Sequence, residues 1–340
     1  MEAIILQEPG KFVYTHTPAL PAPGPGEALV KVHRVGICGT DYHAYRGRQP
    51  FFSYPRILGH ELGVEVVEVG EAVLGLSPGD QCAVEPYLHC GHCSACRQGK
   101  TNCCLHLQVL GVHTDGGLRS FLQLPAPKLH RSPKLSLEQL ALVETLGIGA
   151  HAVDRAQVTE QDTVVVIGAG PIGLSVVAFA QLAGARVVVA DVEAGRLAFC
   201  ANTMGVEATV RVAETAPLEQ IREIFGGDLP SVVFDATGNL ASMTKSFGWV
   251  GHGGRLVFVG LFPGEVTFHD PDFHRRELTL LASRNSTGQD FRRIIELMEA
   301  GRLDTGPWIT HRAAFPDLIR QFDAWLNPRE RVIKAMVKLD

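Results

Sequence analysis

Hydrophobic positions in the first 145 residues alternate with polar ones in short runs that turn residues interrupt. Such runs are 28–32 (ALVKV), 63–69 (GVEVVEV) and 81–84 (QCAV). Alternation over four to eight residues is typical of a strand with one buried face. We therefore predict an all-β region over about residues 1–145.

The pattern changes near residue 160. Residues 163–167 (TVVVI), 186–190 (RVVVA), 231–235 (SVVFD) and 255–259 (RLVFV) are largely apolar, and the stretches between them are helical in character. Strands that are apolar throughout and alternate with helices indicate a parallel sheet covered on both faces. This part of the chain is therefore predicted to be an α/β, doubly wound domain.

The last part of the chain is mixed in character. Helices are predicted near residues 290–300 and 316–326, and a strand over 332–337 (VIKAMV). No internal repeat or low-complexity segment interrupts the three regions.

Composition and charge exclude several classes of protein. The chain has 340 residues, 46% hydrophobic and 20% charged, which suits a globular protein with two domains. The net charge is -5 and the basic residues are scattered, so we expect no nucleic-acid partner. No run approaches the roughly 18–20 apolar residues that cross a bilayer, and the start of the chain lacks the pattern of a secretory signal. We expect a cytoplasmic protein with no membrane partner.

A glycine-rich turn follows the first buried strand of the second region. Gly168, Gly170 and Gly173 form a G-x-G-x-x-G pattern that also contains Pro171 and Ile172. In this setting the first glycine permits a tight turn, the second lets the backbone approach a diphosphate, and the third lets helix pack on strand. The diphosphate would lie at the amino end of the helix. The alternative is a turn with a purely structural role.

Asp191 ends the second buried strand, about 20 residues after the glycines. A carboxylate at this point accepts a hydrogen bond from a ribose 2′-hydroxyl and repels a 2′-phosphate, which favours NAD over NADP. Arg196 instead favours NADP, because a nearby arginine could accept the 2′-phosphate.

Four of the eight cysteines are closely spaced, as Cys90-x2-Cys93-x2-Cys96-x7-Cys104. Two-residue gaps let successive thiolates face one ion, and the longer loop returns a fourth. Four sulfurs leave no open position, so a zinc ion held there would be structural. An iron–sulfur cluster and disulfides are the alternatives, and spacing alone does not choose between Cys103 and Cys104.

A second candidate metal site consists of Cys38, in the run 36–43 (GICGTDYH), and His60, in 59–61 (GHE). These residues can share one ion only if the fold brings them together. A lone cysteine and a lone histidine are more often core or surface residues. The glycine turn and the cysteine-rich segment in the same chain strengthen the hypothesis that Cys38 and His60 share a metal ion.

Through residues 38–41, 59–61, the cysteine-rich segment and the glycine turn, the chain resembles the medium-chain zinc dehydrogenases, in the sorbitol and threonine dehydrogenase-like branch. The resemblance runs essentially end to end. It implies a β-rich, GroES-like catalytic domain over residues 1–146 and 284–340, with a structural zinc lobe at 86–105. It also implies a Rossmann domain over 147–283 and an active site in the cleft between the domains.

The resemblance implies an NAD-dependent alcohol dehydrogenase with two zinc ions per chain, working as a homodimer or homotetramer. Cys38 and His60 would hold the catalytic zinc, and Glu61 or Glu144 would be the further ligand, exchanging with a water. Glu144 matches an acid of the family, although Thr145 replaces the proline that usually follows it. Cys104, rather than its neighbour, would complete the structural site.

The same resemblance implies roles for three of the residues that follow Cys38 in the sequence. Asp41 would orient His60 through its second ring nitrogen. Thr40 and His43 match the family's proton relay, in which the proton of the alcohol leaves through Thr40 and the cofactor ribose to His43, while hydride passes to the nicotinamide. A surface imidazole is the alternative for His43.

Stretches outside the general motifs resemble dehydrogenases of sugar acids of the L-galactonate and L-gulonate type. These stretches are 49–56 (QPFFSYPR), 111–117 (GVHTDGG), 260–262 (GLF), 273–274 (FH) and 283–285 (SRN). The implied reaction oxidises a secondary alcohol of the sugar acid to a ketone. Oxidation of sorbitol, another polyol or L-threonine is the second hypothesis. A non-catalytic protein that binds zinc and a nucleotide is the alternative of another class.

A sugar-acid carboxylate requires a cation, ideally an arginine that binds both of its oxygens. The candidates by position are Arg46, Arg48, Arg56 and Arg284. His113 and Phe51 could line the pocket, although core packing is the plainer explanation for Phe51.

Overall fold

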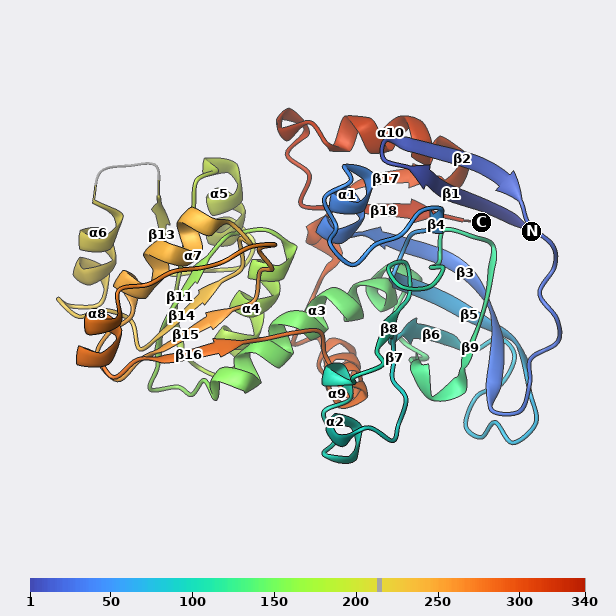
Figure 1. The fold of residues 1–340 in the computed structure, drawn as a ribbon, viewed down its shortest axis with the longest axis horizontal. Helices are drawn as coiled ribbons and strands as arrows, with labels where there is room; N and C mark the ends of the chain where they lie inside the picture. Colours follow the sequence, from blue (N-terminus) through green and yellow to red (C-terminus); the bar gives the residue numbers. More distant parts are fainter. Residues whose placement is uncertain (213–215, 340) are drawn as a thin grey trace. The chain divides into compact units, whose positions relative to one another are not determined.

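The computed structural model describes residues 1–212 and 216–339, and the chain divides into two compact units (Figure 1). Unit 1 comprises Met1–Glu144 and Ser286–Asp340, and unit 2 comprises Thr145–Asn285. The predicted fold class is confirmed: a β-rich unit made of two chain segments accompanies a doubly wound parallel sheet.

Unit 1 is built around a mixed sheet with the strand order β10-β6-β5-β3-β18-β17, and β9 also pairs with β3. The strands of this sheet are β3 (Glu27–Ile37), β5 (Glu61–Val69), β6 (Gln81–Val84), β9 (Phe121–Pro125), β10 (Leu129–Arg131), β17 (Ile309–Ala314) and β18 (Lys334–Lys338). Smaller sheets contain β1 (Glu2–Glu8), β2 (Lys11–His16) and β4 (Arg56–Ile57), and β7 (Tyr87–Leu88) with β8 (Gln108–Val109). Alternate residues of β3, including Ala28, Val30 and Val32, are fully buried, as the period-two pattern predicts.

The prediction of an all-β region over residues 1–145 is wrong, because this region also contains helices. Helix α1 (Gly39–Tyr45) begins after Cys38, whose backbone N–H donates to the Asp41 carboxylate at 2.8 Å. Helix α3 (Leu137–Ala156) begins after Ser136, whose N–H donates to the Gln139 side chain at 3.0 Å while the Ser136 hydroxyl accepts from the Gln139 N–H. Such reciprocal caps start a helix without a long apolar repeat. A third, short helix is α2 (Ser94–Arg97).

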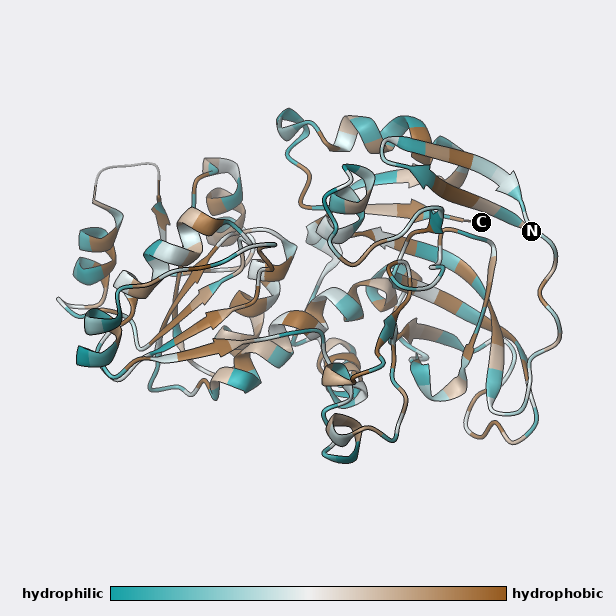
Figure 2. Ribbon diagram, viewed as in Figure 1, coloured by the Kyte–Doolittle hydropathy of each residue, from teal (hydrophilic) through white to brown (hydrophobic). Residues whose placement is uncertain are grey.

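Unit 2 contains a parallel sheet with the order β13-β12-β11-β14-β15-β16, the arrangement of doubly wound dinucleotide-binding domains. Its elements are β11 (Thr163–Ile167), α4 (Pro171–Leu182), β12 (Arg186–Asp191), α5 (Ala194–Asn202), β13 (Ala208–Arg211), α6 (Pro217–Ile224), β14 (Val232–Asp235), α7 (Leu240–Ser246), β15 (Arg255–Phe258), α8 (Asp270–Arg275) and β16 (Thr279–Ala282). The central strands are hydrophobic along their length (Figure 2). Val164 and Val165 point to opposite faces of β11 and are both fully buried, so both faces of the sheet are covered.

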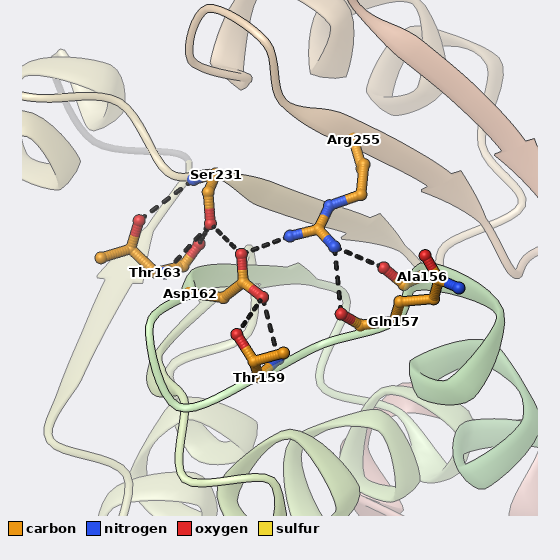
Figure 3. Close-up of polar contacts among 7 residues, drawn as sticks. All are labelled: Ala156, Gln157, Thr159, Asp162, Thr163, Ser231 and Arg255. Carbon is orange, nitrogen blue, oxygen red and sulfur yellow. Dashed lines mark hydrogen bonds and ion pairs between the residues drawn. The ribbon is translucent and has the colours of Figure 1, made fainter.

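A polar cluster closes the end of this sheet at which the strands begin (Figure 3). The Asp162 carboxylate accepts from the Ser231 hydroxyl at 2.7 Å, from the Thr159 N–H at 2.9 Å and from Arg255. Arg255 also donates to the Ala156 carbonyl, at 2.6 Å, and thereby satisfies the carboxyl end of α3. The opposite edge of the sheet, where the strands end, carries the glycine turn.

The final segment returns to unit 1 and adds α9 (Gly288–Glu299) and α10 (Leu318–Trp325). Helix α9 begins with a capping box, in which the Thr287 N–H donates to Asp290 at 2.8 Å. Phe322 of α10 packs its ring 5.0 Å from that of Tyr45, which anchors α1. Within the described residues, no helix combines the length and apolarity needed to cross a bilayer.

Candidate metal centres and nucleotide site

The register of two strands explains why Cys38 and His60 meet. Strand β3 ends immediately before Cys38, and β5 begins immediately after His60. The strands are antiparallel, with Gly36 opposite Glu61, so the end of one strand lies beside the start of the other. Residues 22 positions apart in the sequence are thereby brought to one end of one sheet.

Ligand atoms of Cys38, His60 and Glu61 lie within 4.8 Å of one another. A thiolate, an imidazole and a carboxylate suit a zinc ion that keeps a position open for a further ligand. His60 Nδ1 and Asp41 Oδ1 are buried without a hydrogen-bond partner in the described structure, at a separation of 3.8 Å. This distance exceeds a hydrogen bond, so the predicted contact between Asp41 and His60 is close but not formed. The chemistry of the three donors therefore fits a bound metal.

Glu61 is fully buried and is held by a buried lysine. Lys334 Nζ donates to both Glu61 oxygens, at 2.6 and 2.7 Å, and approaches the Ile37 carbonyl at 3.4 Å. Burial alone lowers the pKa of Lys334, but the negative charges of Glu61 and Cys38 outweigh it and raise that pKa. Lys334 is therefore a cation that partly neutralises the acidic donor set.

Glu144, the other candidate ligand, lies outside the group of three donors. It is buried on α3, its Oε1 accepts a hydrogen bond from the Tyr87 hydroxyl, and burial raises its pKa. The two carboxylates therefore differ in their surroundings. Glu61 lies close to the ligand atoms of Cys38 and His60, whereas Glu144 is hydrogen-bonded to Tyr87.

Thr40 and His43 lie three residues apart on α1, directly after Cys38, and so share one face of the helix. His43 is exposed at the end of the helix. Partial burial lowers the pKa of His43, and the charges of Arg46 and Arg48 lower it further. The imidazole is therefore neutral at pH 7 and able to accept a proton.

The predicted cysteine cluster is compact. The sulfur of Cys93 lies 3.4 Å from that of Cys96 and 3.9 Å from that of Cys104, and Cys104 lies 3.5 Å from Cys90. Four thiolates on one zinc ion, at zinc–sulfur distances near 2.3 Å, would be about 3.8 Å apart. The cluster includes Cys104, whereas Cys103 is exposed.

Backbone N–H groups around these sulfurs favour thiolates. The Cys90 and His106 N–H groups each donate to the Cys104 sulfur at 3.3 Å. The N–H groups of Cys96 and Leu105 lower the pKa of Cys93 to about 6. The donor set and its geometry therefore fit a zinc ion with no open position.

The glycine turn joins β11 to α4, as predicted. Gly168 has φ +100°, a conformation that favours glycine, and a side chain at Gly173 would overlap the Gly168 carbonyl. Gly170 is the N-cap of α4, and Pro171 and Ile172 form its first turn. The free N–H groups of this twelve-residue helix face the turn, as a diphosphate site requires.

Asp191 is hydrogen-bonded to the same turn. Its Oδ2 accepts from the Ala169 N–H at 2.6 Å, and its Oδ1 accepts from the Glu193 N–H at 2.8 Å. Arg196 Nη1 would lie 3.6 Å from a Cβ placed on Gly170, so this guanidinium also reaches the turn. The structure thus gathers the predicted nucleotide-binding residues at the carboxyl edge of the sheet.

The arginine candidates for a substrate carboxylate differ in their surroundings. Arg56 pairs with Asp115 at 3.3 Å and Ser53 at 2.9 Å, and Arg46 donates to the Leu326 carbonyl at 3.5 Å. Arg48 is exposed beside His43, and its guanidinium contacts no acceptor in the described parts of the chain. Arg284 lies in unit 2 and has an interaction of its own. The core-packing explanation of Phe51 is wrong, since its side chain is 58% exposed.

Sequence reasoning missed Tyr87 and Lys334. Neither belongs to a spaced motif, and a buried lysine in a strand cannot be distinguished from an exposed one by alternation alone.

Comparison with known proteins adds to this geometry. Residues 24–134 match the family of alcohol dehydrogenase GroES-like domains, and residues 171–300 match the zinc-binding dehydrogenase family. It is 42% identical over 337 residues to L-galactonate-5-dehydrogenase of Escherichia coli (strain K12), covering 99% of this chain and 98% of that protein. It is 31% identical to L-threonine 3-dehydrogenase of Pyrococcus horikoshii, over 92% of this chain and 91% of that protein.

Among solved structures, a short chain alcohol dehydrogenase (rspB) from E. coli, in complex with NADH, superposes with a TM-score of 0.93 at 30% identity. The match covers 100% of this chain and 99% of that chain.

Proposed function

This chain belongs to the zinc-binding alcohol dehydrogenase family, whose members are oxidoreductases acting on CH–OH groups, and we propose that it oxidises a secondary alcohol of a sugar acid to a ketone with NAD. The observation that carries the proposal is the meeting of Cys38, His60 and Glu61 within 4.8 Å in a chain that also has a dinucleotide turn. The 42% identity to an L-galactonate-5-dehydrogenase supports a sugar acid as the substrate.

Cys38, His60 and Glu61 would hold the catalytic zinc, with Glu144 as an alternative ligand. A zinc ion held there would polarise the alcohol oxygen and favour loss of its proton. Thr40 and the neutral His43, three residues apart on α1, would carry this proton away from the alcohol. Gly168–Gly173 would hold the diphosphate of NAD and Asp191 its ribose, and the bound cofactor would supply the acceptor for the hydride. Cys90, Cys93, Cys96 and Cys104 would hold the second, structural zinc.

Arg48 is the best of the candidates to bind the substrate carboxylate. It lies shortly after α1, which ends at Tyr45, its backbone N–H donates to the His43 carbonyl at 2.8 Å, and no described acceptor occupies its guanidinium. A charge-assisted bond of this kind contributes roughly 1.5–3 kcal/mol, about 10- to 100-fold in affinity.

The test is a substrate panel of L-galactonate, L-gulonate, sorbitol and L-threonine with NAD or NADP, followed by absorbance of the reduced cofactor. We expect kcat/KM to be highest for a sugar acid with NAD. Arg48→Gln should raise KM for the sugar acid about tenfold or more and leave KM for sorbitol unchanged. Arg46→Gln is the matched control, because its guanidinium already bonds the Leu326 carbonyl.

Higher activity with sorbitol or L-threonine than with either sugar acid would overturn the substrate assignment. L-Threonine is the second candidate because of the identity to the Pyrococcus horikoshii enzyme. Purified protein should contain about two zinc ions per chain by elemental analysis. A content of one ion per chain would mean that the site at Cys38 and His60 binds no metal.

We also propose a homo-oligomer in the cytoplasm. Strand β16 ends the parallel sheet and is largely exposed, with no charged residue in Thr279–Ala282. An uncharged strand edge of this kind is suited to pairing with a second copy. All eight cysteines lie in the described residues and none of them forms a disulfide, which suits a reducing compartment.

A further inference from the structure

Two buried carboxylates of unit 1 are each bonded by one buried side chain. Lys334 Nζ donates to both oxygens of Glu61, at 2.6 and 2.7 Å, and the Tyr87 hydroxyl donates to Glu144 Oε1. Glu61 belongs to the group of three donors whose ligand atoms lie within 4.8 Å of one another, whereas Glu144 does not. The two carboxylates therefore have different keepers and different relations to the candidate metal centre.

Glu144 and Tyr87 nevertheless lie within electrostatic range of that centre. Burial raises the pKa of Glu144, and the charge of His60 acts against this rise. Burial also raises the pKa of Tyr87 well above its ordinary value, and the charges of Glu144 and Cys38 raise it further. The Tyr87 phenol therefore keeps its proton and remains the donor in its bond to Glu144. Tyr87 is 2% exposed and Glu144 is 4% exposed, so bulk water competes little for this bond.

The chain fixes Tyr87 on both sides. Tyr87 begins β7, which pairs with β8. Two residues earlier, the Glu85 carboxylate accepts from His130 at 3.2 Å, and two residues later His89 Nδ1 contacts Lys128 Nζ at 2.9 Å. Because the backbone around Tyr87 is already ordered, its hydroxyl restrains Glu144 at little further cost in conformational entropy.

We infer that Tyr87 is a positioning residue whose hydroxyl keeps Glu144 out of the ligand set of the metal. Three protein ligands, Cys38, His60 and Glu61, would then hold the ion and leave a fourth position open for the alcohol. The inference rests on the proposed function and deepens it. A catalytic zinc site keeps such an open position, whereas a fourth protein ligand closes the site.

Removing the hydroxyl should therefore close the site. In Tyr87→Phe the ring remains, but Glu144 Oε1 loses its donor. A buried carboxylate that has lost a hydrogen-bond donor is stabilised by binding a cation. The expected variant holds its metal more tightly and is less active. General destabilisation would have the opposite effect, because it would release the metal faster.

The experiment measures release of zinc from the full-length, zinc-loaded protein to a chelator, and the phase that is absent in Cys38→Ser identifies the site. Changes around metal ligands typically alter metal affinity about 10- to 100-fold. Tyr87→Phe should release this zinc about tenfold more slowly than wild type, and adding Glu144→Gln should restore the wild-type rate. Tyr14→Phe is the matched control, because the Tyr14 hydroxyl also donates to a glutamate, Glu2, at an exposed position.

A second measurement reports the open position directly. With cobalt(II) in place of zinc, the visible absorption spectrum changes when a further ligand binds the ion. Imidazole should change the spectrum of wild type and of Tyr14→Phe, and should leave that of Tyr87→Phe unchanged, because Glu144 then occupies the position.

Glu144→Gln alone tests the inference even if Tyr87→Phe does not fold. It should release zinc at the wild-type rate, whereas Glu61→Gln should release it about tenfold faster. Equal acceleration in these two variants overturns the inference, as does unchanged release and imidazole binding in Tyr87→Phe, and both results leave the proposed oxidation of a sugar acid intact. A wild type with no release phase that depends on Cys38 instead overturns the proposed catalytic metal centre and, with it, the inference.

Discussion

His43 shows how neighbouring residues set the chemistry of one side chain. Its pKa is lowered first by partial burial and then by the charges of Arg46 and Arg48. A lowered pKa means that the imidazole remains neutral to a pH below its ordinary value of about 6.5. A neutral imidazole near pH 7 is the form that the proposed relay requires, because it can accept a proton.

We predict that His43→Gln lowers kcat/KM for alcohol oxidation about 10²-fold at pH 7, the lower range for a lost acid–base group. In wild type, kcat/KM should fall as the pH drops through the lowered pKa of His43, and the variant should lose this dependence. Steady-state kinetics across pH 5–8 checks both expectations. His16→Gln is the control, because His16 is an exposed histidine on β2. Unchanged activity in His43→Gln would exclude the imidazole from the relay.

At the scale of elements, a buried charge cluster joins β6, β10 and α9. The Glu85 carboxylate, just after β6, accepts from Lys128 and, at 3.2 Å, from His130. The His130 ring stacks on Phe291 of α9 at 5.0 Å. Lys128 also contacts His89 Nδ1 at 2.9 Å, next to the first cysteine of the cluster. These contacts tie the cysteine-rich segment to the sheet of unit 1.

Breaking this cluster should destabilise the protein in a pH-dependent way. Burial raises the pKa of Glu85, but His130 and Lys128 outweigh it, and the net pKa is lowered. A lowered folded-state pKa contributes stability above the unfolded value of about 4.3, and this stability is lost as the pH falls through the folded value.

We therefore predict that Glu85→Gln lowers the free energy of unfolding by about 3 kcal/mol at pH 7, the scale for one partner of a buried pair. The difference from wild type should shrink below about pH 4. Urea unfolding at pH 7, 5 and 4 measures it. Glu207→Gln, which removes an exposed partner of Arg186, should change stability little. A difference that persists undiminished at low pH would contradict the assignment to the ionised carboxylate.

At the scale of the whole molecule, the uncharged edge of β16 is the feature that favours association. Leu280 on this strand is 39% exposed. Native sheets usually protect such an edge with charge, proline or a covering segment. We expect a second copy of the chain to pair here.

Leu280→Lys should therefore shift the protein toward a monomer of 36.8 kDa, measured by light scattering after size-exclusion chromatography. The charge would lie at the pairing edge and oppose close approach of its symmetric equivalent. Leu74→Lys is the control, because Leu74 is 92% exposed and belongs to unit 1 rather than to the unit that contains β16. An unchanged oligomer in Leu280→Lys would place the interface elsewhere.

The sequence by itself determined the fold class and the features that depend on short segments. The fully apolar strands predicted the parallel sheet, because a strand covered on both faces has no polar side to show. The glycine turn and the cysteine spacing were recognisable because each site is built from neighbouring residues. Helices α1 and α3 were missed because caps, rather than apolar periodicity, begin them.

Only the tertiary structure decided which distant residues share a site. The antiparallel register of β3 and β5 brings Cys38 to His60, and β18 adds Lys334 from almost 300 residues further along the chain. Tertiary contacts likewise separate Glu61 from Glu144 and Cys104 from Cys103, since the two residues of each pair are alternative candidates in the sequence but differ in burial or partners. The physical reason is that ligand geometry depends on strand pairing, and pairing is a property of the whole sheet.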